Sequence, residues 1–358
     1  MSDAVSDLPW LIYGANGHTG HRIAQQAVLN GYKPILAGRK TREIERLARE
    51  LKCPHRIFSL DNIEQTADQL TDVKAVLHCA GPFVNTAVPM LDACLAAKVD
   101  YLDISGEIPS IEAAVERHDR ALEAGISLVP ASAFEMVPAD CLAAQVAAKL
   151  PSADRLQVAF TAVGRISPGT ARTIVTHLPT SGRVRRGGKL ENVPIAFKSM
   201  DISFPTGMQH AATFGTADLI TAWHTTGIPN IEAYAAMPPW QTTVLKQFSW
   251  MGPVIEVGAF RDMAAMVLQK TWTSQAPRSD QDGRVFLWAR AYDPQEKCVE
   301  AVMETIEAYR FTVLVALAAM AKMLAGNVPK GFHTPSKAYG VDFAESIPGT
   351  QVIWVKQP

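Results

Sequence analysis

The sequence predicts an α/β protein, with a doubly wound parallel sheet and an inserted α+β second domain. Three observations predict this fold. Strands and helices alternate regularly over the first 140 residues, a glycine-rich turn follows the first apolar run, and the alternation stops after Pro151. A chain of 358 residues is also too long for one average core, so two domains are expected.

The first strand, at Leu11 to Tyr13, runs into three glycines spaced three residues apart, and a helix follows. Gly14 allows the turn, Gly17 lets a pyrophosphate approach the backbone, and Gly20 lets the helix lie close to the sheet. Backbone N–H groups and the helix dipole would then face the phosphates. The glycine pattern alone is weak and could be an ordinary loop, but its context favours a nucleotide site. The residues predicted to contact the cofactor in this turn are Gly14, Asn16, Gly17, His18, Thr19 and Gly20.

The second strand, Pro34 to Ala37, ends at Gly38-Arg39-Lys40, about where an NAD-binding unit places an acid for the ribose 2′-hydroxyl. Two adjacent cations stand there instead, and they suit the 2′-phosphate of NADP. Arg39 and Lys40 are therefore predicted cofactor contacts, with NADP(H) favoured over NAD(H). The alternative is that they are solvated residues at a helix end.

Two further turns are predicted to border the cofactor. Asp61 and Asn62 follow the third strand, Arg56 to Leu60, and either contact the adenine or cap the next helix. The fourth strand, Lys74 to His78, ends across the crevice from the glycine-rich turn, where ligands bind in such sheets. The residues predicted to run along the cofactor there are Ala80, Gly81, Pro82 and Phe83, although a plain Gly-Pro turn would also explain them.

Acidic and phenolic side chains follow the last two strands of this domain. The fifth strand, Val99 to Ile104, carries Tyr101 and Asp103 just ahead of Glu107, and the sixth, Ile126 to Pro130, leads to Glu135. All four are candidate catalytic groups, and Asp103 or Glu107 could equally cap the helix expected from Pro109 to Ala124.

From Pro151 the pattern becomes that of a mostly antiparallel α+β domain. A long helix from about Glu307 to Ala325 is apolar almost all round, so we expect it to return to the first domain, with the tail after Gly326. The predicted domains are 1–142 plus about 306–358, and 143–305. The predicted strands are 156–163, 210–214, 230–237, 284–292 and 299–305, with a hairpin at 183–188 and helices at 170–178, 217–226 and 257–272.

Composition excludes several classes of protein. The net charge of −1 supplies no field to attract nucleic acid or anionic lipid. The five cysteines are scattered without a C-x-x-C pair, which fits a reducing, cytoplasmic location and no metal site. The longest apolar run, Phe311 to Met320, is too short to span a membrane, and Met1 to Asp7 does not resemble a leader. The expected partner is a small-molecule substrate.

Several motifs in order resemble the saccharopine dehydrogenase-like oxidoreductases, a group that includes the trans-acting enoyl reductases. The matching blocks are Gly14–Gly20, Ala37–Arg39, Ala80–Phe83, Tyr101–Glu107, Phe134–Asp140, Gly169–Arg172, Thr226–Asn230 and Gly331–Pro335, so they span most of the chain. The resemblance implies a Rossmann domain interrupted by an α/β domain that lines the substrate cleft, NADP(H) in many members, and often paired subunits. One departure is that Glu135-Met136 stands where the family commonly has Asp-Ser.

The predicted function is hydride transfer between NADPH and a small or medium organic substrate at a C=N, C=O or C=C bond. The cofactor supplies the hydride, and the protein supplies a proton donor or a cation near the developing charge. Arg172, near the start of a predicted helix, could hold a substrate carboxylate, or it could be a surface cation. Aromatic residues of the second domain, if they line a pocket, favour an apolar substrate. The alternative function is a non-catalytic NADP-binding sensor or scaffold.

Overall fold

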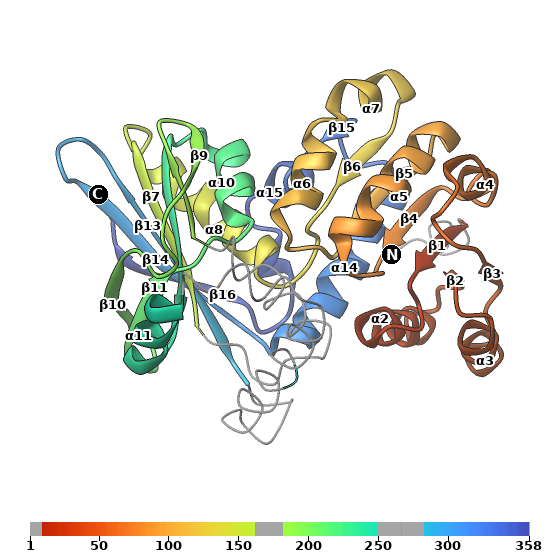
Figure 1. The fold of residues 1–358 in the computed structure, drawn as a ribbon, viewed down its shortest axis with the longest axis horizontal. Coiled ribbons are helices and arrows are strands. Elements are labelled where there is room, and N and C mark those ends of the chain that lie inside the picture. Colours follow the sequence, from red (N-terminus) through yellow and green to blue (C-terminus); the bar gives the residue numbers. More distant parts are fainter. Residues whose placement is uncertain (1–8, 162–181, 249–265, 267–282, 358) are drawn as a thin grey trace. The chain divides into compact units, whose positions relative to one another are not determined.

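The computed structural model describes residues 9–161, 182–248, 266 and 283–357 (Figure 1). The chain forms two compact units. The first comprises Met1–Val137 and Tyr309–Gly340, and the second comprises Pro138–Ala308 and Val341–Pro358. The first unit therefore takes two separate stretches of the chain.

The first unit is built on a parallel sheet. Its described strands lie in the order β15-β6-β5-β4-β1-β2-β3, so strand order reverses between β1 and β4. Strands β1, β2, β4 and β5 are buried at every position, which explains their continuous apolar runs. The strands are β1 Trp10–Tyr13, β2 Ile35–Gly38, β3 His55–Ile57, β4 Ala75–His78, β5 Asp100–Asp103, β6 Ser127–Val129 and β15 Gly331–Phe332.

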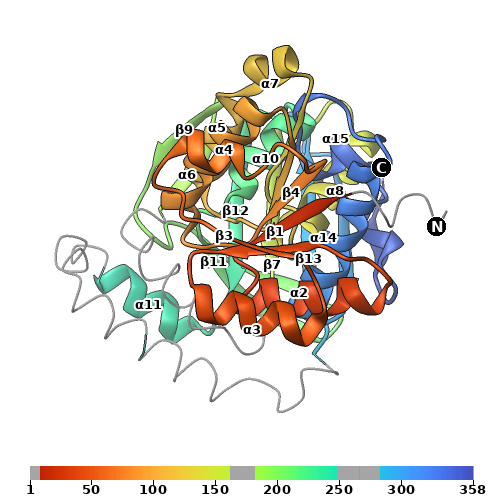
Figure 2. The ribbon, with the colours of Figure 1, turned by 90° about the vertical axis from the view of Figure 1, so that its right-hand side faces the viewer.

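Helices cover both faces of this sheet. The helices α2 and α3 lie on one side of it, and α4, α5 and α6 lie on the other (Figure 2). The predicted doubly wound sheet is thereby confirmed. The helices are α2 His18–Leu29, α3 Thr41–Leu51, α4 Ile63–Asp68, α5 Phe83–Ala97, α6 Ile108–Val115, α7 His118–Ala124, α14 Ala308–Leu324 and α15 Pro335–Tyr339.

The second unit has a mixed sheet of nine strands within the described residues (Figure 1). Only β12 and β7 pair in parallel, and the other described pairs are antiparallel, as predicted. Its strands are β7 Arg155–Phe160, β8 Arg183–Arg186, β9 Lys189–Asn192, β10 Ser199–Phe204, β11 Gly207–Thr213, β12 Asn230–Ala236, β13 Val285–Tyr292, β14 Cys298–Thr305 and β16 Gln351–Lys356. Its helices are α8 Met136–Lys149, α10 Asp218–Thr226 and α11 Pro239–Phe248, and a short 3-10 helix, η3, spans Ala344–Ser346.

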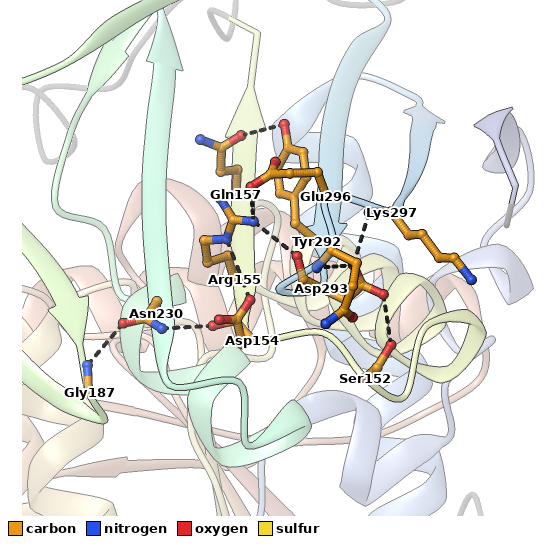
Figure 3. A network of polar contacts seen from close by, with 11 residues as sticks. Ser152, Asp154, Arg155, Gln157, Gly187, Asn230, Tyr292, Asp293, Glu296 and Lys297 are labelled. Carbon is orange, nitrogen blue, oxygen red and sulfur yellow. Dashed lines mark hydrogen bonds and ion pairs between the residues drawn. The ribbon is translucent and has the colours of Figure 1, made fainter.

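One polar network ties the ends of several strands of this sheet together (Figure 3). Arg155 at the start of β7 donates to the Asp293 carbonyl at 3.0 Å and to Glu296 at 2.6 Å. Asn230 at the start of β12 donates to the Asp154 carbonyl and accepts from the Gly187 N–H. Since these groups are hydrogen-bonded to one another, the network holds the strand ends together, and we propose no ligand for it.

The structure differs from the sequence-based expectations in several places. The strand β10 and the helix α11 were not predicted. The expected helix from Pro109 to Ala124 is two helices, α6 and α7. The tail does not finish in the first unit, because β16 pairs with β14 in the second sheet.

The predicted helices at 170–178 and 257–272 lie outside the described residues, apart from position 266. No helix in the described ranges is long and apolar enough to cross a membrane.

Candidate nucleotide site

The three glycines of the first turn pack against one another and against β4. Gly14 has φ +82°, and a Cβ there would lie 2.8 Å from the Ala80 nitrogen. A Cβ on Gly20 would lie 2.4 Å from the Gly14 carbonyl oxygen, and one on Gly17 would lie 3.2 Å from it. Gly20 is thus needed for contact between helix α2 and the turn itself, rather than with the sheet as a whole. Side chains on Gly14 and Gly20 would therefore clash with backbone atoms. We call these three glycines and the start of α2 the glycine cradle.

The amino end of α2 is arranged to receive an anion. Gly17 is its N-cap, no side chain caps the helix, and the first turn carries no acid. Two other helices of this unit differ. Asn62 caps α4 by accepting from the Gln65 N–H at 2.9 Å, and Glu107 accepts from the first two N–H groups of α5. The first turn of the 12-residue helix α2 therefore brings no carboxylate of its own to the positive end of the helix dipole.

The turn after β2 brings cations and an acid together. Arg39 is exposed, and in the described part of the chain no carboxylate forms an ion pair with it. Lys40 pairs with Glu43 at 2.9 Å, and the other Glu43 oxygen accepts from the Asn16 amide at 2.7 Å. The hydrogen bond from Lys40 has the larger effect and that from Asn16 the smaller, and together they hold the pKa of Glu43 below its usual range. The carboxylate therefore stays charged. The sequence-based prediction missed Glu43, which α3 carries to this turn.

Asp61 and Tyr13 mark the same edge of the sheet. Burial raises the pKa of Tyr13 to about 12, the Arg39 charge lowers it and the Asp61 charge raises it. Asp61 is exposed, and the capping role belongs to its neighbour Asn62. A contact between Asp61 and adenine stays a prediction.

The turn after β4 packs on the glycine cradle. Ala80 lies against Gly14, and Gly81 and Pro82 are exposed at the carboxyl end of the strand. Phe83 is buried, with its ring 5.3 Å from that of His78. The structure therefore leaves Ala80, Gly81 and Pro82 beside the cradle and places Phe83 in the core.

Tyr101 and Asp103 are fully buried and are hydrogen-bonded to each other. The Tyr101 hydroxyl donates to Asp103 at 2.6 Å, and the second Asp103 oxygen accepts from the Ser105 and Ala131 N–H groups at 2.9 and 2.8 Å. Burial raises the pKa of both groups, although these hydrogen bonds lower that of Asp103. The pair joins β5 to the loop after β6, a structural role.

Glu107 is the third member of the predicted catalytic cluster, and it is 5% exposed. Its two carboxylate oxygens accept from the Phe83 and Val84 N–H groups at 3.1 and 2.7 Å. Sequence reasoning allowed for a cap, but on the helix that directly follows Glu107. The structure shows that it caps α5, 24 residues earlier, which only the fold brings near.

Glu135 lies in a strained loop. It is half-buried with φ +74°, and Ala131 has φ +62°. The loop is fixed between them, because the Phe134 N–H donates to Thr312 at 3.0 Å and the Phe134 ring packs on Phe311. Non-glycine residues in this conformation are uncommon and gather at functional sites. Of the acids proposed for catalysis, Glu135 is the one with this signature.

Arg172 lies outside the described residues, so its proposed contact with a substrate stays a prediction. Within the described ranges, no group of three His, Cys, Asp or Glu side chains could hold a metal ion.

Comparisons with known proteins agree with this geometry. Residues 10–129 match the family model of the saccharopine dehydrogenase NADP binding domain. A probable mitochondrial saccharopine dehydrogenase-like oxidoreductase of Arabidopsis thaliana is 34% identical over 147 residues, which are 36% of this chain and 32% of the relative. The human saccharopine dehydrogenase-like oxidoreductase is 27% identical over 38% of this chain and 29% of its own. A trans-acting enoyl reductase of Mycobacterium ulcerans is 25% identical over 39% and 35%.

Among solved structures, the chain is similar to apo saccharopine dehydrogenase (L-Glu forming) from Saccharomyces cerevisiae. The TM-score is 0.67, with 10% identity, over 98% of this chain and 100% of that one. This likeness confirms the fold over both units.

The matches to the curated relatives span about a third of the length of each. Residues 10–129 are therefore similar to a saccharopine dehydrogenase NADP binding domain, as the motifs predicted.

Proposed function

We propose that the chain is an oxidoreductase that transfers hydride between NADPH and a small or medium organic substrate at a C=N, C=O or C=C bond. The observation that carries the proposal is the glycine cradle at the uncapped amino end of α2, at the point where strand order reverses. The oxidoreductase names of its relatives support the reaction class.

The cradle fits a dinucleotide. Gly14 and Gly20 let the turn pack closely on Ala80 and on α2. Gly17 would let a pyrophosphate approach the amino end of α2, where N–H groups and the dipole favour negative charge. Arg39, at the end of β2, would bind the 2′-phosphate through charge-assisted hydrogen bonds. Ala80, Gly81 and Pro82 would border the cofactor on the other side of the reversal point.

NADPH supplies a hydride when bound, and the chain must supply the proton. Glu135 is our candidate proton donor, because it is half-buried at the carboxyl end of β6 in a strained loop. Tyr101, Asp103 and Glu107 hold the strand ends and the start of α5 in place. Arg172 remains the candidate for a substrate carboxylate. A cytoplasmic location and a homodimer also stay proposals.

Turnover separates this function from a non-catalytic NADP-binding sensor. Purified protein and NADPH are mixed with a 2-oxo acid plus an amine, with simple ketones and with enoyl thioesters, and nicotinamide absorbance is followed. We expect NADPH oxidation with at least one class, and the responding class identifies the bond reduced. Glu135→Gln should lower kcat at least tenfold with an unchanged Kd for NADPH.

The matched control is Glu123→Gln, an exposed glutamate on α7, which should leave kcat unchanged. Tight NADPH binding with no oxidation by any class would favour the sensor. Equal kcat values for wild type and Glu135→Gln would remove Glu135 from the reaction.

A further inference from the structure

Glu43 contacts both the glycine-rich turn and the turn after β2, and a bound dinucleotide would contact the same two turns. One carboxylate oxygen accepts from Asn16 in the glycine-rich turn at 2.7 Å, and the other pairs with Lys40 after β2 at 2.9 Å. The Asn16 side chain in turn lies over Gly38, whose Cβ, if present, would be 3.1 Å from the Asn16 amide oxygen. The carboxylate therefore stands at the carboxyl ends of β1 and β2.

This is the edge where the adenosine ribose of a dinucleotide lies in such sheets. An acid there accepts a hydrogen bond from the ribose 2′-hydroxyl of NAD(H), whereas a cation there pairs with the 2′-phosphate of NADP(H). The chain has both, because α3 brings Glu43 to a turn that also carries Arg39 and Lys40. Glu43 also pairs with Lys40, which leaves Arg39 as the cation of this turn with no carboxylate paired to it among the described residues.

We propose that Glu43 determines cofactor specificity by limiting the preference of this site for NADP(H) over NAD(H). Its charge repels a 2′-phosphate, engages Lys40 and offers an acceptor to a 2′-hydroxyl. The inference rests on the proposed function, because it assumes that a nicotinamide dinucleotide binds at the cradle.

Glu43, like any exposed glutamate, is ionised at neutral pH, and its hydrogen bonds to Lys40 and Asn16 lower its pKa further. The pair is exposed at the surface, so its removal should change the stability of the fold little. Its effect on a bound phosphate should weaken as salt is raised, since both charges are in reach of solvent.

The experiment measures Kd for NADPH and NADH by fluorescence titration of the full chain, for wild type and Glu43→Gln, at low and high salt. Glu43→Gln should tighten NADPH binding about tenfold at low salt and leave NADH binding equal or slightly weaker. The matched control is Glu50→Gln, which removes the same charge from the exposed far end of α3 and should change neither Kd.

A double-mutant cycle with Lys40→Gln isolates the pair. Lys40→Gln should weaken NADPH binding about twofold in wild type and more in the Glu43→Gln background, where Lys40 is released. Thermal unfolding of each variant confirms that it is folded.

An unchanged ratio of NADPH to NADH affinity in folded Glu43→Gln would overturn the inference and leave the proposed function standing. So would an equal change in Glu50→Gln. If wild type binds neither nucleotide, the proposed function fails, and this inference fails with it.

Discussion

Two regions of the first unit present polar residues at the carboxyl ends of parallel strands, and they differ in what those residues already bind. At the ends of β1 and β2, helix α2 has no side-chain cap and Arg39 is exposed. At the end of β5, Asp103 accepts three hydrogen bonds, and both carboxylate oxygens of Glu107 accept from N–H groups at the start of α5. We therefore propose ligand binding for the first region and a structural role for the second.

The difference shows that an acidic residue at the carboxyl end of a strand is not catalytic by its position alone. A buried carboxylate whose oxygens are filled by backbone N–H groups fixes loops, and it has little capacity left for a substrate. Changes in the first region should therefore alter nucleotide binding, and changes in the second should alter stability.

The largest effect is expected from Gly17→Val. The branched side chain would crowd the Gly14 carbonyl and occupy the space of the pyrophosphate, so Kd for NADPH and for NADH should rise about a thousandfold. Fluorescence titration measures this. The matched control is Gly106→Ala in the second region, where a Cβ would meet nothing within 4 Å and binding should not change. Normal affinity in Gly17→Val would mean that the glycines form only a loop.

Asp103→Ala tests the second region. It leaves the Tyr101 hydroxyl and two backbone N–H groups buried without an acceptor, so the free energy of unfolding should fall by about 3 kcal/mol. Urea denaturation checks the loss, and Tyr101→Phe, which removes one hydrogen bond, should cost about 1 kcal/mol. The Kd for NADPH of the folded variant should match wild type. A large rise in that Kd would show that the two regions belong to one binding site.

His78 lies between the regions, with its ring near those of Tyr13 and Tyr101. Burial lowers the pKa of His78 to about 3 from the unfolded value of 6.5. The neutral form is therefore favoured by folding, and this stability is present above pH 6.5 and lost as the pH falls toward 3.

The loss at pH 5 should be about 2 kcal/mol. Urea denaturation at pH 7 and pH 5 should show that wild type loses this much more than His78→Asn, which cannot titrate. Equal losses in the two proteins would show that His78 does not control the pH dependence.

Sequence reasoning succeeded where the signal is local. The glycine turn, the strand ends and the cap next to Asp61 depend on residues a few positions apart. It failed where the partner is distant. Glu107 caps a helix 24 residues earlier, and β16 joins a strand about 50 residues before it. Glu43 was missed because its contact with Asn16 follows from the position of α3, which no spacing rule gives.

The most direct test of the account is a titration of wild type and Arg39→Gln with NADPH and with NADH, with Lys40→Gln as the matched control. Arg39→Gln should raise Kd for NADPH about tenfold and leave Kd for NADH unchanged, because only the 2′-phosphate is lost as a partner. Lys40→Gln should have a smaller effect, since Glu43 already pairs with Lys40. Equal losses for both nucleotides in Arg39→Gln, or no binding by wild type, would contradict the assignment of this edge as an NADP site.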